Sequence, residues 1–131
     1  MWGAALHDRA TGIHRPLEAT VIWLEPLERH LGEAQLIASL DHCILDSEEI
    51  LRIRQAIASA CKIPVNNIQV TLTHTHGSGW MSRTRAELPG GELIGPYLNE
   101  LLVRLTQTAA KARSKRTPAC FVFAKGRCNL A

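Results

Sequence analysis

Residues 68–79 read IQVTLTHTHGSG, an alternating strand pattern that runs into two histidines and then into glycine. Side chains two positions apart on a β-strand point to the same face of the sheet. We therefore predict an interior strand over residues 68–75 that buries its apolar row and ends in two imidazoles on one side. The members of this row are Ile68, Val70, Leu72, His74 and His76.

The two histidines need polar partners, because burying an unpaired polar group costs roughly 1–3 kcal/mol. A divalent metal at the strand's carboxyl end would satisfy both, and imidazole nitrogen is a common zinc ligand. The sequence thus indicates His74 and His76 as candidate ligands of Zn²⁺. Two hydrogen-bonded structural histidines are the alternative. Asp41, next to His42, is either a carboxylate that orients a metal-bound histidine or simply the end of a strand.

The flanking segments predict an α/β fold with a mixed sheet of about four strands. Residues 18–24 and 34–43 are rich in apolar and β-branched side chains, which favours strands. Asp46 and Glu49 form a capping-box pattern at the start of an amphipathic helix over 47–61, and Pro64 stops that helix. Strand, helix and strand in this order predict a parallel βαβ unit.

The second half of the chain predicts a long loop, a helix and a strand. Residues 77–92 contain several glycines and begin at the histidines, so we expect this loop to cover the site. Residues 93–113 carry an apolar stripe at helical spacing, and residues 117–125 have strand composition. Two helices would then cover the sheet on at least one side.

Composition limits the classes of function. The 131 residues suit a single domain, 46% of them are hydrophobic, and the net charge is only +3. The basic residues between 111 and 116 suit a helix C-terminus and have no aromatic residues among them, so we expect no nucleic-acid partner. No transmembrane run or signal peptide is visible. The apolar surroundings of Cys43, Cys61 and Cys120 predict small core residues and favour a reducing compartment such as the cytoplasm.

A longer stretch carries a family resemblance. Residues 66–79, NNIQVTLTHTHGSG, resemble the segment around the Thr-His-Thr-His-Ser-Gly motif of the neutral/alkaline non-lysosomal ceramidase family. Residues 12–17, GIHRPL, look like the Gly-Ile-His segment that leads into the first long strand of that family. The order of the predicted elements is similar to the amino-terminal part of its catalytic domain. Where the family has Ser-Gly-Pro after the second histidine, this chain has Gly77-Ser78-Gly79.

The resemblance implies zinc-dependent hydrolysis of an amide bond in a small-molecule N-acyl lipid. It implies that His74 binds the zinc directly, that the catalytic residue His76 binds metal or positions the scissile carbonyl, and that the loop from Gly77 to Gly91 forms a wall of the pocket. The family's other ligands lie further along its chain, so we expect residues 1–131 to be one incomplete piece of a larger hydrolase domain, inactive by itself. A non-catalytic α/β binding module with structural histidines remains the alternative.

Overall fold

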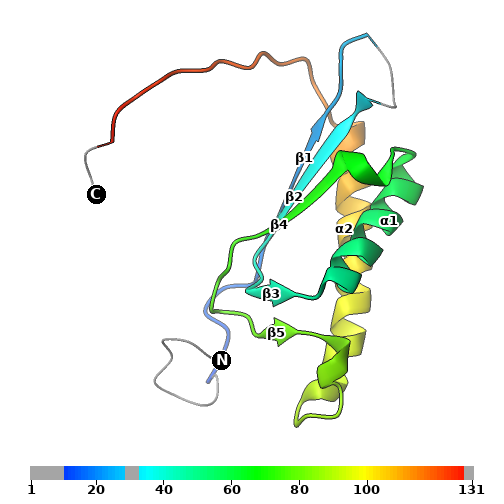
Figure 1. Ribbon diagram of the computed structural model, residues 1–131, viewed down its shortest axis with the longest axis vertical. Coiled ribbons are helices and arrows are strands. Elements are labelled where there is room, and N and C mark those ends of the chain that lie inside the picture. The colour runs from blue at the N-terminus through cyan, green and yellow to red at the C-terminus, as the bar shows by residue number, and fades with distance from the viewer. Residues whose placement is uncertain (1–10, 29–32, 129–131) are drawn as a thin grey trace.

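The computed structural model describes residues 11–28 and 33–128 of the chain, and it confirms a mixed α/β fold (Figure 1). A three-stranded sheet has the order β1-β2-β4, formed by Ala19–Leu24, Gln35–Leu40 and Ile68–Leu72. β1 is antiparallel to β2, and β4 is parallel to β2. The predicted parallel βαβ unit is therefore present as β2, the first helix and β4.

Two helices pack against the same face of this sheet (Figure 1). Helix α1 spans Ser47–Cys61, as predicted, and helix α2 spans Ile94–Ser114. Asp46 makes no side-chain cap to α1, so the predicted capping box does not form. Its carboxylate instead accepts a hydrogen bond from Trp80 Nε1 at 3.0 Å. Neither helix of the described part of the chain combines the length and apolar character needed to cross a bilayer.

The hydrophobic core lies between the sheet and the two helices. The central strand β2 buries alternate residues, and its intervening side chains lie on the face that no helix covers. Burial of a large aliphatic side chain contributes about 1.5–3 kcal/mol, so this row accounts for much of the driving force. The most deeply buried large aliphatic residues, each at most 1% exposed, are Leu36, Leu40, Ile57 and Leu105.

The strand that leads to the histidines differs from the prediction. β4 ends at Leu72 and lies at the edge of the three-stranded sheet, whereas the alternation predicted an interior strand up to residue 75. Ile68 is buried, but Val70 and Leu72 are only half-buried, and His74 and His76 are exposed, so the predicted burial of the whole row is wrong. The strand stops because His74 adopts φ 58°, a left-handed conformation that an extended strand cannot contain.

The predicted strand over residues 117–125 is also absent. The described residues after α2 form neither a helix nor a strand, and Cys120 is exposed rather than part of a core. A strand exists only as part of a hydrogen-bonded ladder, and none of the described strands pairs with this segment. Its strand composition is therefore present without the pairing that would make it a strand.

Candidate metal centre

A candidate metal centre forms where the carboxyl ends of two parallel strands meet. Cys43 follows β2 by three residues, and His74 follows β4 by two. The register pairs Leu40 with Leu72. Backbone hydrogen bonds then extend the contact beyond the strands: Thr73 N–H donates to Leu40 O and His74 N–H donates to His42 O, both at 3.0 Å. Cys43 and His74 are therefore brought together by the sheet.

The side chains of Cys43, His74 and His76 converge. One ligand atom from each lies within 4.8 Å of the other two, and Cys43 Sγ is 3.9 Å from His74 Nε2. The two imidazole rings are 5.4 Å apart between centroids and inclined at 61°. Zinc bond lengths in a tetrahedral site place sulfur and nitrogen ligands about 3.6 Å apart. A small inward movement would suffice for all three side chains to hold one ion.

The histidines meet through a turn rather than through strand alternation. His74 is beyond the end of β4, and its φ of 58° redirects the chain. Left-handed backbone at a residue other than glycine is uncommon, costs about 1–3 kcal/mol and often occurs at ligand-binding sites. The predicted meeting of the two rings is thus confirmed, but the local backbone that achieves it is different.

A second, two-stranded sheet connects the segments that carry the candidate ligands. β3, Ile44–Leu45, begins directly after Cys43, and β5, Trp80–Met81, follows the histidine turn and runs parallel to β3. The Cys43 N–H donates to the hydroxyl oxygen of Ser78 at 2.9 Å, and Ser78 is only 5% exposed. The segments that carry the candidate ligands are therefore tied to each other on both sides of the site.

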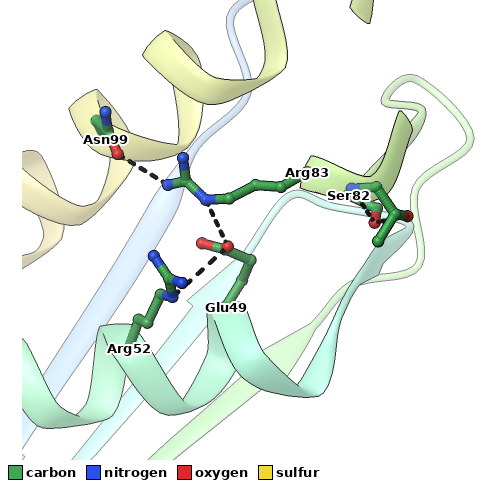
Figure 2. A network of polar contacts seen from close by, with 6 residues as sticks. Glu49, Arg52, Ser82, Arg83 and Asn99 are labelled. Carbon is green, nitrogen blue, oxygen red and sulfur yellow. Dashed lines mark hydrogen bonds and ion pairs between the residues drawn. The ribbon is translucent and has the colours of Figure 1, made fainter. Parts of the chain in front are cut away.

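Polar contacts fasten the next part of the loop to both helices (Figure 2). Arg83 Nε donates to Glu49 on α1 at 2.7 Å, and Arg83 Nη2 donates to Asn99 on α2 at 2.8 Å. Ser82 is fully buried and accepts a hydrogen bond from Thr84 N–H at 3.2 Å. Gly91 packs so closely that an added Cβ would lie 2.1 Å from a carbonyl oxygen. Much of the predicted loop is thus locally ordered.

Glu49→Gln tests how much this fastening contributes to stability. Glu49 is 5% exposed, and its carboxylate accepts the charged Arg83 hydrogen bond. A hydrogen bond to a charged group contributes about 1.5–3 kcal/mol, and the partial exposure of Arg83 places the expected loss at the lower end. Urea unfolding measures it. Glu48→Gln, at an exposed position in the same helical turn, should change the free energy of unfolding far less, and equal effects would contradict this role.

His42 points toward α2 and is not part of the candidate metal centre. It is 2% exposed, its Nε2 lies 2.7 Å from the Tyr97 hydroxyl, and its Nδ1 has no hydrogen-bond partner in the described part of the chain. Burial lowers the pKa of His42, against a smaller opposing effect of the Asp41 charge, and burial raises the pKa of Tyr97. Both groups are therefore held neutral beside a cavity of about 420 Å³ that none of the three candidate ligands lines.

Asp41 does not hydrogen-bond to either candidate histidine. Its carboxylate accepts from Glu18 N–H at 3.0 Å and from the Thr73 hydroxyl at 3.1 Å. It thus connects the start of β1 to the residue before His74, which agrees with the simpler interpretation of a strand terminus.

Cys43 is the candidate ligand that sequence reasoning missed. Its apolar surroundings predicted a core residue, and it is indeed 2% exposed. The available signal was its place just past the end of a strand in a βαβ unit, because the carboxyl ends of parallel strands meet at one edge of a sheet. Within the described residues the converging group has three members, and three is the number of protein ligands that catalytic zinc sites commonly use.

Comparisons with protein-family models, with characterised proteins and with solved structures found no match to this chain. The fold and the site geometry therefore define the molecule at the level of an α/β protein with a candidate Cys-His-His metal centre.

Proposed function

We propose that Cys43, His74 and His76 bind one zinc ion and that this centre serves the hydrolysis of an amide bond in an N-acyl substrate. The convergence of their three ligand atoms within 4.8 Å is the observation that carries the proposal. The ligand set combines a soft thiolate with two imidazoles, which suits zinc. The N-acyl substrate class rests on the resemblance of residues 66–79 to the ceramidase family.

The three proposed ligands differ in how far they are exposed to solvent. Cys43 is buried and would hold the ion from the protein side, whereas both histidines are exposed. The candidate centre is therefore accessible from the side of the histidines, where water and substrate can reach it. A zinc ion bound there would polarise the amide carbonyl and lower the pKa of a bound water toward about 7. Water addition to the amide then yields a carboxylate and a free amine.

The chain's own residues would position these reactants. Cys43 is held by its N–H bond to Ser78, and His74 is held by its backbone bond to His42 O. His76 is the residue with two roles in this proposal, either as the third ligand or as a donor to the scissile carbonyl. The family resemblance implied that the remaining ligands lie further along the chain than residue 131, whereas Cys43 offers a third candidate ligand from within residues 1–131.

The Cys43→Ser variant tests whether these residues form a metal centre or whether the two histidines are purely structural. We expect the chain to bind one equivalent of Zn²⁺ in equilibrium dialysis. The Cys43→Ser variant should bind Zn²⁺ at least about 100-fold more weakly, because loss of a residue that only hydrogen-bonds to a metal ligand already lowers metal affinity by about 10–100-fold. With Co²⁺ as the probe, a sulfur-to-metal charge-transfer band should be present in the natural chain and absent from the variant. Cys61→Ser, at another buried cysteine, is the matched control.

Two outcomes would contradict different parts of the proposal. Zinc binding that survives Cys43→Ser without a sulfur band would remove Cys43 from the ligand set. Zinc bound as expected, with no release of fatty acid from a long-chain N-acyl amine by the zinc-loaded protein, would leave a metal-binding module and reject the amide hydrolysis.

A further inference from the structure

A cavity of about 420 Å³ lies between helix α2 and the ends of two strands, and the proposed metal centre does not use it. Its walls come from residues 17–19 at the start of β1, from residues 40–42 at the end of β2, and from one side of α2 between Tyr97 and Thr108. Small-molecule sites commonly have volumes of about 300–1,000 Å³. The cavity therefore has the size of a small-ligand site.

Apolar side chains form much of the wall, and a buried polar pair is set among them. Leu40 and Leu105 are almost fully buried and line the cavity. His42 and Tyr97 also line it, with the Tyr97 hydroxyl 2.7 Å from His42 Nε2. His42 Nδ1 has no partner among the described residues, although buried polar groups in folded proteins are nearly always hydrogen-bonded. Apolar walls with a few polar groups are the usual composition of a ligand site.

The charged residues of the wall give the cavity a negative character. Glu18, Asp41 and Glu100 contribute three carboxylates, whereas Arg104 contributes the single positive charge of the described lining. Arg104 is already paired with Glu100 at 2.6 Å. Neither Glu18 nor Asp41 forms an ion pair with a lysine or arginine in the described part of the chain. A wall with two unbalanced carboxylates attracts a cation and repels an anion.

Neutral hydrogen bonds hold one of these unbalanced carboxylates in place. Asp41 Oδ2 accepts from Glu18 N–H at 3.0 Å, and Asp41 Oδ1 accepts from the Thr73 hydroxyl at 3.1 Å. These donors orient the carboxylate without cancelling its charge. An ionised carboxylate has about four acceptor positions, so Asp41 can accept further hydrogen bonds. An ammonium group would be a strong donor to it, because both partners would carry charge.

We infer that this cavity binds a small organic cation, an amine that has a protonated amino group and an apolar body. The amino group would lie at Glu18 and Asp41, and the apolar body would contact Leu40 and Leu105. A neutral alcohol of the same shape would gain the apolar contacts alone, and a carboxylate would meet like charges. The inference does not depend on the metal centre, because none of the three candidate ligands lines the cavity.

Three six-carbon probes that differ in one group test this charge preference: hexylamine, 1-hexanol and hexanoic acid. Tyr97 is the single tyrosine of the chain and lines the cavity, so labelling with 3-fluorotyrosine places one fluorine resonance at the site. In titrations of the full chain at neutral pH, we expect hexylamine to shift this resonance to saturation. It should bind at least about 10-fold more tightly than 1-hexanol, because charge-assisted hydrogen bonds are the stronger ones. Hexanoate should cause no shift over the same concentrations.

Removing the two unbalanced charges should abolish the preference and keep the cavity. In the Glu18→Gln, Asp41→Asn variant we expect hexylamine to bind no more tightly than 1-hexanol, and 1-hexanol to bind as it does to the natural chain. Glu18→Gln alone, at an exposed position, should reduce the preference in part and provides the test if the double variant does not fold. Glu48→Gln removes an exposed carboxylate outside the cavity and should keep the full preference. His74→Ala should keep it too, which separates this site from the metal centre.

Three results would overturn the inference. The first is an unchanged Tyr97 resonance at saturating concentrations expected for hexylamine, since the cavity would then take no small amine. The second is equal or tighter binding of 1-hexanol or hexanoate, which would show that charge does not select the ligand. The third is a full preference for hexylamine in both the single and the double variant, which would place the cation away from Glu18 and Asp41.

Discussion

His74→Ala should abolish measurable zinc binding while the chain keeps its fold. The His74 side chain is exposed and contributes one of three converging ligand atoms, so its loss removes metal affinity rather than core packing. We expect the zinc affinity to fall by more than about 100-fold, since substitution of residues that merely support ligands costs 10–100-fold. Zinc should accordingly raise the unfolding midpoint of the natural chain and not that of the variant. In a zinc-loaded hydrolase, amide cleavage would be lost with the metal.

Two control variants make this result interpretable. His14→Ala removes an exposed histidine on another part of the chain and should leave zinc binding unchanged. His74→Gly removes the same ligand but suits φ 58° without strain, so it should lose zinc as His74→Ala does and unfold at a higher urea concentration than His74→Ala. Stoichiometric zinc retained by both His74 variants would show that the histidines are structural.

Ile57→Ala should destabilise the fold more than any surface substitution on the same helix. Ile57 is fully buried, on α1, in the core between the helices and the sheet. Truncating a buried isoleucine to alanine typically costs about 2–5 kcal/mol, through lost apolar transfer energy and the cavity that remains. A domain of this size has only about 5–15 kcal/mol of stability, so the change should be obvious in urea unfolding.

Leu51→Ala on the same helix is the matched control. Leu51 is 45% exposed, and the substitution removes an aliphatic side chain of similar size from a position that water already reaches. We expect its effect to be below about 1 kcal/mol, with the slope of the urea transition unchanged in both variants. Equal losses for Ile57→Ala and Leu51→Ala would contradict the placement of α1 against the sheet.

The local periodicity of the sequence determined most of the elements. The alternation from Ile68 to Leu72 specified a strand, and the apolar spacing over residues 47–61 specified a helix with the bounds that the structure has. These patterns depend on the geometry of neighbouring residues along one element, so they can be recognised without a partner. The α/β class and the parallel βαβ unit followed from their order.

Tertiary structure alone decided how the site is assembled. The pairing of Leu40 with Leu72 sets Cys43 beside His74, thirty-one residues apart in the chain, and no local period encodes that register. The left-handed turn at His74 and the edge position of β4 likewise depend on neighbours distant in sequence. Residues 117–124 are the converse case, because they carry the composition of a strand but pair with none of the described strands. Strand propensity is local, whereas strand formation requires a partner.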